Sequence, residues 1–342
     1  MLDTFLFLLA DGITNGAVYG LVALSLIVIY TVTRVVNIAQ GQYVTLGALS
    51  FASALSGSFN VLNAIVAGGI AVFALKDAVD RHLTIAVRMR ILLLRTLWIL
   101  AVLATAWAAN LLPGSYWISV LASLVATASL GALAYRLTVE PVADASPIVL
   151  LIVSVGVYMV FDGLAVMIWG AEPRSVPPVI DGGLALGSVF VTYQSLWICA
   201  SSVVAMVALY LFSERTLIGQ ALQATAVNRT GAQLCGIPVS VAGQLSFAIG
   251  AGFSALSGLL LAPLVTANYD MGFPIGLKAF VAAALGGIVE YPTALIGVLL
   301  VGTTESFSAF QASAFRDVVV FLMVIPILLW RNAVRPPEAH EH

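Results

Sequence analysis

The chain has 342 residues, of which 61% are hydrophobic and 9% are charged, and its mean hydropathy is +1.07. Soluble globular proteins carry about 25% charged residues, so this composition excludes a water-soluble domain, and no basic patch of a nucleic-acid-binding protein is present. Apolar runs near twenty residues recur without the ten-residue alternation of a barrel. We therefore predict an all-α, polytopic integral membrane protein forming a single domain over residues 1–342.

The first apolar run is expected to be a retained span and not a signal peptide, because Asp3 stands where a positive region would be required. The pattern predicts about nine to eleven transmembrane or re-entrant helices. Segments 61–75 and 276–288 are short for a full crossing and are expected to be tilted, broken or re-entrant. The expected segments are 5–31, 39–56, 61–75, 95–112, 117–138, 148–169, 194–212, 241–262, 276–288, 293–311 and 317–331.

The basic residues predict the orientation. With the N-terminus outside, alternation of these segments leaves only Arg174 and Arg316 clearly on the outer side, while Lys278 lies within a segment. Basic residues mark the cytoplasmic side, so the C-terminus is expected in the cytoplasm. The residues that gather on the cytoplasmic side are Arg34, Lys76, Arg81, Arg88, Arg90, Arg95, Arg136, Arg215, Arg229, Arg331 and Arg335.

Residues 34–42, RVVNIAQGQ, interrupt the first two apolar runs with the amides of Asn37, Gln40 and Gln42. Unpaired amides at membrane depth cost several kcal/mol and need polar partners or a wet cavity. Two interpretations stay open: a helix break beside a translocation path, and a tight polar turn at the inner surface.

Residues 76–95 form a predicted amphipathic helix at the cytoplasmic surface. At 100° per residue most of its charged side chains share one face, and Val79, Leu83 and Met89 lie opposite. A basic polar face suits anionic lipid headgroups, and contact with a partner subunit is the alternative. On the outer side, the loop 171–187 is rich in Pro and Gly and is expected to be a connector or a lid-like turn.

The segment 214–238, which contains RTLIGQALQATAVNRTGAQLCGIP, is predicted to lie in the cytoplasm as two short helices with a break near Val227 and Asn228. Asn228 suits a helix start, and Gly236 followed by Pro238 suits a helix stop. Such an element is a natural docking site for a cytosolic partner, and a plain surface loop is the alternative.

Asp162, Lys278 and Glu305 are ionisable residues within or at the edge of apolar segments. Intramembrane charge indicates a functional site, although a structural Lys278–Glu305 pair would explain two of them equally well. No phosphate-binding loop motif, zinc-ligand cluster or hydrolase triad is present, so we expect a transport protein and not an enzyme.

Three stretches together resemble the permease subunits of branched-chain amino acid ABC importers, a family that also serves urea, short amides and aromatic acids. They are NGAVYGLVALSLIVIYTVTRVVNIAQGQYVTLGA, residues 15–48; ERTLIGQALQATAVNRTGAQLCGIPVSVAGQLSFAIGAGFSALSGLL, residues 214–260; and MGFPIGLKAFVAAALGGIVEYPTALIGVLLVGTTES, residues 271–306. The chain is most similar to the first of the two Liv-type inner-membrane permeases. Residues 57–115 look like an insertion relative to ordinary members.

The resemblance implies two sets of functional residues. Asn37, Gln40, Gly41, Gln42, Lys278 and Glu305 match the family's polar turn and late helices and are expected along the translocation path. The positions expected to couple to an ATPase are Arg215, Thr216, Gly219, Ala221, Leu222, Ala224, Asn228, Arg229, Ala232 and Gly236.

The resemblance also implies the partners. They are a homologous second permease or a second copy, two cytosolic ATPase subunits that hold ATP and magnesium, a solute-binding protein and the lipid bilayer. No cofactor or metal is expected in this chain itself. The implied function is import of a small amino acid or related solute across the cytoplasmic membrane. A stand-alone secondary transporter or channel is the alternative from a different class.

Overall fold

The computed structural model describes residues 2–58, 60–79, 85–143, 145–186, 189–286, 291–323, 325–326 and 329. The first ten expected apolar segments fall on helices in the part of the chain that the structure describes, and the last, 317–331, is helical over 317–322, with part of the remainder outside the described residues. The helices over the first part of the chain are α1 Leu2–Thr33, α2 Gln40–Leu55, α3 Val61–Val79, α4 Ile85–Leu111, α5 Tyr116–Ala134 and α6 Pro147–Trp169. The later ones are α7 Tyr193–Arg215, α8 Leu217–Val227, α9 Arg229–Leu234, α10 Val239–Leu261, α11 Gly272–Gly286, α12 Tyr291–Gln311 and α13 Arg316–Leu322.

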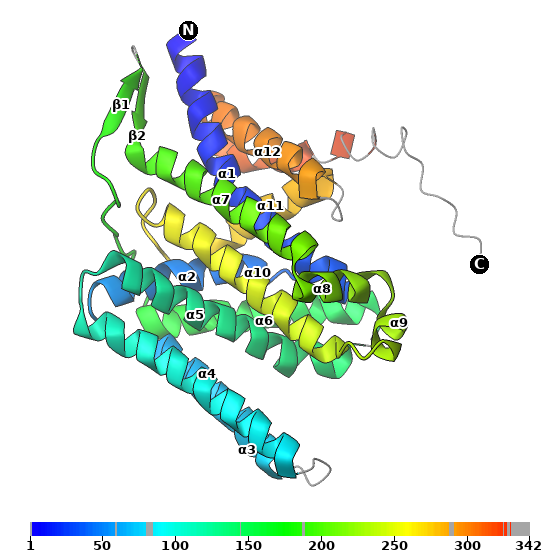
Figure 1. The fold of residues 1–342 in the computed structure, drawn as a ribbon. Helices are drawn as coiled ribbons and strands as arrows, with labels where there is room; N and C mark the ends of the chain where they lie inside the picture. The colour runs from blue at the N-terminus through cyan, green and yellow to red at the C-terminus, as the bar shows by residue number, and fades with distance from the viewer. Residues whose placement is uncertain are drawn as a thin grey trace.

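The described residues include seven helices that are long and apolar enough to cross a bilayer, which confirms an all-α polytopic membrane protein. These helices cover 3–33, 89–111, 116–142, 147–169, 193–215, 239–261 and 294–311. The shorter α2 and α11 lie inside the bundle. Figure 1 shows α3 and α4 projecting from the bundle as an antiparallel hairpin.

Helix α2 forms the centre of the bundle. All residues from Gln40 to Ala54 are buried, and α10, α5, α11 and α6 pack around them. Small residues permit this packing: a Cβ on Gly47 would lie 2.6 Å from the Cα of Ala255, and one on Gly258 would lie 2.1 Å from the carbonyl oxygen of Val44. Helix α2, which is short for a full bilayer crossing, is therefore enclosed by other helices on all sides.

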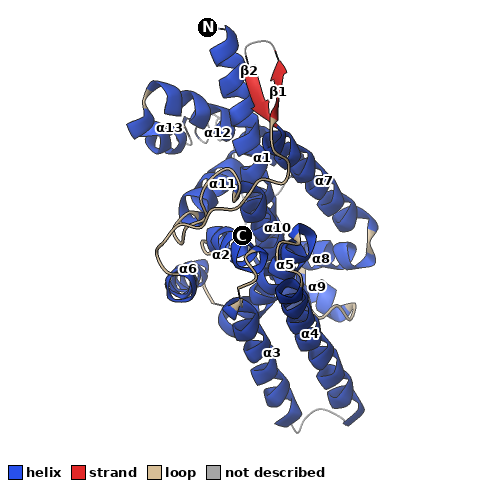
Figure 2. Cartoon of the chain, turned by 90° about the vertical axis from the view of Figure 1, so that its left-hand side faces the viewer, coloured by secondary structure: helices blue, strands red, loops and turns tan. Residues whose placement is uncertain are grey.

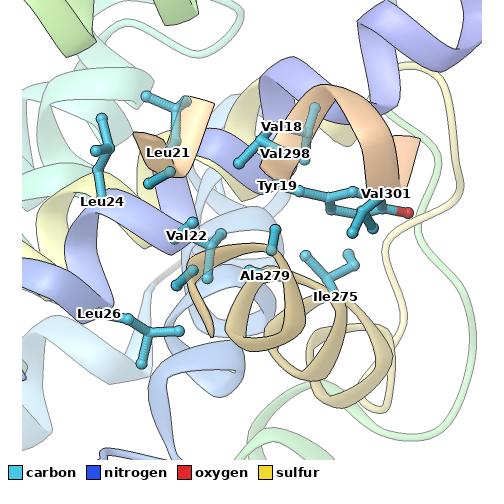
Figure 3. Close-up of a cluster of buried hydrophobic side chains, with 14 of the residues drawn as sticks. Val18, Tyr19, Leu21, Val22, Leu24, Leu26, Ile275, Ala279, Val298 and Val301 are labelled. Atoms are coloured by element: carbon cyan, nitrogen blue, oxygen red, sulfur yellow. The ribbon is translucent and has the colours of Figure 1, made fainter. Parts of the chain in front are cut away.

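A second core lies where α1 meets α11 and α12. Figure 3 shows Val18 and Val22 of α1 near Ala279 of α11 and Val298 of α12. Gly12 and Gly302 bring the backbones of α1 and α12 together, since a Cβ on Gly302 would lie 2.3 Å from the carbonyl oxygen of Gly12. The first half of α1 is thus fixed against the late helices.

Two sequence expectations are corrected. The amphipathic helix expected over 76–95 is not one continuous element, because α3 ends at Val79 and α4 begins at Ile85 and runs back beside it (Figure 2). Asp77 explains the reversal: its carboxylate pairs with Arg95 of α4 and, at 3.4 Å, with Arg136 after α5. Residues 80–84 of the expected helix lie outside the described part of the chain.

The Pro- and Gly-rich segment that follows α6 also contains strands that the sequence did not predict. Strands β1 Gly183–Leu186 and β2 Val189–Thr192 form an antiparallel hairpin with Gly183 opposite Thr192. Arg174 and Ala267 form a separate antiparallel bridge, which ties the preceding loop to the segment after α10. The hairpin stands beside the N-terminal end of α1 in both views (Figures 1 and 2), so this segment is more than a connector.

Candidate functional site

A charged cluster lies where α1, α11, α12 and α13 meet. The Lys278 Nζ atom is 2.6 Å from Oε1 of Glu305 and 2.8 Å from Oδ1 of Asp317. Glu305 also accepts a hydrogen bond of 2.5 Å from the Tyr19 hydroxyl, and Arg316 lies 3.5 Å from the same carboxylate. Lys278 and Glu305 are buried, at 3% and 5% exposure, so both expected residues meet directly.

This cluster forms one wall of a cavity of about 760 Å³, a size typical of sites for small molecules. The cavity extends along the first half of α1, past β2, to the segment between α10 and α11. Its polar lining includes Asp11, whose Oδ2 atom accepts hydrogen bonds from Ser306 at 2.7 Å and Asn15 at 3.3 Å. The cavity therefore offers both a cation and carboxylates to a solute.

The polar turn before α2 is fully engaged inside the bundle. The Gln40 side-chain amide lies 2.7 Å from Ser25 Oγ and 2.8 Å from Ser254 Oγ, and it donates to the Gly250 carbonyl at 2.9 Å. Asn37 donates to Oε1 of Gln40 at 3.1 Å. Both amides are buried with partners, so they hold α1, α2 and α10 together at this turn.

Gln42 faces another direction, where its Nε2 atom donates to Oδ1 of Asp162 on α6 at 3.0 Å. Gly41 lies between these amides where α2 crosses the start of α11 closely. A Cβ on Gly41 would stand 2.1 Å from the Gly272 carbonyl oxygen, and one on Gly276 would stand 2.7 Å from the Gly41 Cα. Gly276 is two residues before Lys278, so α11 joins the polar turn to the charged cluster.

A second cavity, of about 410 Å³, lies on the other side of α11. Asn37 is its polar member, while Leu26, Leu151, Phe273 and Phe280 are among the apolar side chains that line the rest. The six expected path residues are thus not gathered in one place. Asn37 borders the apolar cavity, and Lys278 and Glu305 border the charged one.

The segment 214–238 has the expected two-helix form. Asn228 accepts a hydrogen bond of 2.9 Å from the Gly231 N–H and begins α9. Thr216 does the same for α8, accepting from the Gly219 N–H at 3.0 Å. Gly236, with a φ of 82°, ends the second helix. The break between α8 and α9 falls at Asn228, as the sequence predicted.

The residues expected to couple to an ATPase divide into two groups in this segment. Gly219, Leu222 and Ala232 are buried within the chain. Leu222 packs with Val32 of α1 and Ala242 of α10. A Cβ on Gly219 would lie 2.2 Å from the Phe212 carbonyl oxygen, so this glycine allows the close turn from α7 into α8. This group packs inside the chain and holds the loop in place.

The outward face of the loop carries apolar side chains that the sequence analysis did not single out. Leu217, Val227 and Leu234 are each 85% exposed. Gly236, Asn228 and Ala224 of the expected set are also exposed. In the sequence, large apolar residues alternate with the small Gly219, Ala221 and Ala224, and this pattern could have indicated an apolar surface. The sequence alone did not show which of the large residues face outward.

Arg34 joins this loop to the polar turn. It ends α1 in the left-handed conformation, with a φ of 59°, and its Nη2 atom donates to the Ala226 carbonyl at 2.9 Å, at the C-terminal end of α8. A cation suits that end of a helix because the last carbonyls are unsatisfied there. Only two residues separate Arg34 from the buried Asn37, so the loop and the turn are mechanically connected.

The charged cluster around Lys278 and Glu305 includes residues that were not predicted from the sequence. Tyr19 and Asp317 complete the partners of Glu305 and Lys278, and Arg316 lies at the edge. A tyrosine in an apolar span gave no signal of its pairing with a carboxylate 286 residues away.

Comparison with known proteins gives one consistent family. Residues 84–328 match the family described as "Branched-chain amino acid transport system / permease component". Over 339 residues the chain is 27% identical to the high-affinity branched-chain amino acid transport system permease protein LivH of Salmonella typhimurium, covering 96% of this chain and 95% of that protein. The Escherichia coli K12 LivH gives the same figures, and Pseudomonas aeruginosa BraD is 26% identical over 330 residues, covering 94% and 92%.

Proposed function

Because the chain belongs to the branched-chain amino acid transport permease family, a family of transport subunits and not of enzymes, we propose that it forms the solute path of an ATP-driven importer. It is a multi-pass protein of the inner membrane, as its apolar helices and its relatives indicate. The proposed cargo is a branched-chain amino acid or a similarly small amino acid, the class that the names of LivH and BraD give for those proteins.

The observation that carries this proposal is the α8–α9 loop. Neutral hydrogen bonds and buried small residues fix the loop on the bundle, while Leu217, Val227 and Leu234 extend from it. Exposed apolar side chains of this size suit a groove on a protein partner. The partner is a cytosolic ATPase subunit that binds ATP and magnesium, and the loop and C-terminus lie in the cytoplasm.

The transport cycle that follows uses the connections of this chain. Movement of α8 acts through Arg34 on the end of α1 and on the turn that holds Asn37 and Gln40. The same turn crosses α11 at Gly41, so a displacement reaches the helix that bears Lys278. The helices rock between outward-open and inward-open states, and a homologous second permease, or a second copy, encloses the path.

Reconstitution tests this function. The chain is co-expressed with the permease, ATPase and binding-protein genes that accompany it, and radiolabelled L-leucine uptake is measured in proteoliposomes. We expect uptake that requires ATP and the binding protein and stops when the ATPase is inactivated by mutation. Accumulation of leucine by vesicles that hold this chain without any ATPase would instead identify a secondary transporter.

A further inference from the structure

We propose that the Lys278 ammonium is the subsite for the carboxylate of the transported solute, and that Asp317 occupies this place until a solute displaces it. This inference rests on the proposed transport function and names one chemical group that the path recognises. It starts from the two carboxylates that meet Lys278, because they differ in how firmly each is held.

Glu305 is the permanent partner of Lys278. Its side chain is 6% exposed, and it is fixed by the Tyr19 hydroxyl at 2.5 Å as well as by the lysine at 2.6 Å. Removing it would leave the buried ammonium with only the half-exposed Asp317 as a counter-charge, which is costly. These contacts of Glu305 are sufficient for a structural ion pair between α11 and α12.

Asp317 is the replaceable partner. Its side chain is 48% exposed and belongs to α13, which is seven residues long in the described part and begins directly after the short 3-10 turn Ser313–Phe315. Apart from Lys278, Asp317 also pairs with the neighbouring Arg316, at 3.4 Å. A carboxylate in this position can return to water at little cost, because it has lost only part of its hydration.

Charge balance favours the exchange. Lys278 and Arg316 stand against Glu305 and Asp317, so the cluster is neutral. When a solute carboxylate takes the place of Asp317 on Lys278, the cluster again holds two cations and two carboxylates, and Lys278 is not left without a counter-charge. Lys278 lines the cavity of about 760 Å³, so a small solute can reach it.

The matching variant is Asp317→Asn, which keeps the shape of the side chain and removes the competing charge. The permease–ATPase complex is purified in nanodiscs without binding protein, and binding is measured for three probes. They are L-leucine, 4-methylpentanoate, which lacks the ammonium, and 3-methylbutylamine, which lacks the carboxylate. We expect the variant to bind the first two roughly tenfold more tightly than wild type, the gain from removing one charged competitor.

Two further variants make the result specific. Lys278→Met combined with Glu305→Gln removes both charges of the permanent pair without leaving either one alone, and it should lose at least tenfold in affinity for both carboxylates. Asp181→Asn makes the same acid-to-amide change in the outer loop, away from the cluster, and should leave all three affinities unchanged. Binding of 3-methylbutylamine should not respond to Asp317→Asn.

Unchanged or undetectable binding of leucine and 4-methylpentanoate by Asp317→Asn would overturn the inference. ATP-driven leucine uptake by the same complex would then still support the transport function, so the two failures are distinguishable. If uptake itself fails, the response of 4-methylpentanoate binding to Asp317→Asn still decides whether Lys278 accepts a carboxylate.

Discussion

The two functional regions of this protein are built in opposite ways. The cavity beside α1 gathers buried charges that neutralise one another, with Lys278 between two carboxylates. The α8–α9 loop, beyond the other end of α1, is held by helix caps such as Asn228 to Gly231 and by the Arg34 hydrogen bond, contains no ion pair in the described structure, and presents exposed apolar side chains. The 32-residue α1 joins them over about 48 Å.

This difference indicates what each region can recognise. A neutral cluster that borders a cavity can exchange one of its ions for a charged small molecule without leaving a charge buried. A surface of exposed apolar side chains binds by excluding water from a broad contact, as protein interfaces do. The following predictions test the contrast in order of their expected effect on the stability of this chain.

The largest effect is expected for Lys278→Met, which leaves the Glu305 carboxylate buried without its cation. The free energy of unfolding should fall by about 3–5 kcal/mol. Thermal unfolding in detergent measures this, and the double variant with Glu305→Gln should recover much of the loss. A single variant that is as stable as the double variant would show that Glu305 does not depend on Lys278.

Gly219→Ala should cost about 1–3 kcal/mol, because even one methyl group meets the carbonyl oxygens of Phe212 and Ser213. The α7–α8 turn would open, and less ATPase subunit should co-purify with the chain. Gly231→Ala is the matched control in the same loop, since its added Cβ would approach only the Asn228 side chain, at 3.3 Å or more. Equal ATPase recovery for both variants would contradict this role of Gly219.

Arg34→Ala should cost about 1 kcal/mol, since it removes one exposed hydrogen bond from a cation to the end of α8. Its larger effect should be functional: ATP hydrolysis by the assembled complex continues while leucine uptake falls several-fold. Arg34→Lys keeps a cation near Ala226 and should restore part of the uptake. Uptake and hydrolysis that fall in parallel would show that Arg34 acts only on assembly.

Leu217→Ser should barely change the stability of this chain, because its side chain makes little contact in the described structure and is 85% exposed. ATPase co-purification should nevertheless decrease. Gln220→Ser, an exposed change within the same helix that removes no apolar surface, is the control. If ATPase binding by Leu217→Ser equals that of the control, the outward apolar face is not the docking surface.

Hydropathy and helix punctuation were sufficient to predict the helices. Asn228 and Gly236 have local signatures, and both act where the sequence placed them. The burial of α2 could not be predicted in this way, because a lipid-facing helix and a protein-facing helix are both apolar. The β1–β2 hairpin was missed for a related reason. A short apolar run such as VFVT, residues 189–192, is not distinctive in a chain that is apolar throughout.

The ion pairs show a similar limit for the site. Lys278 and Glu305 were recognised as candidates because charge is rare in such segments. Their contacts with Tyr19 and Asp317 depend on how α1 and α13 pack, which no local pattern encodes. The reversal of the chain between α3 and α4 likewise depends on Asp77 meeting Arg95, a contact between separate helices.

Labelling of Cys235 tests the central claim that the α8–α9 loop receives an ATPase in the cytoplasm. This cysteine is exposed directly after α9, and a Cys199→Ser background leaves it as the single thiol. A membrane-impermeant maleimide should label it in inside-out vesicles, more slowly once the ATPase subunit is bound, and should not label it in intact cells. Labelling from outside intact cells would contradict the account.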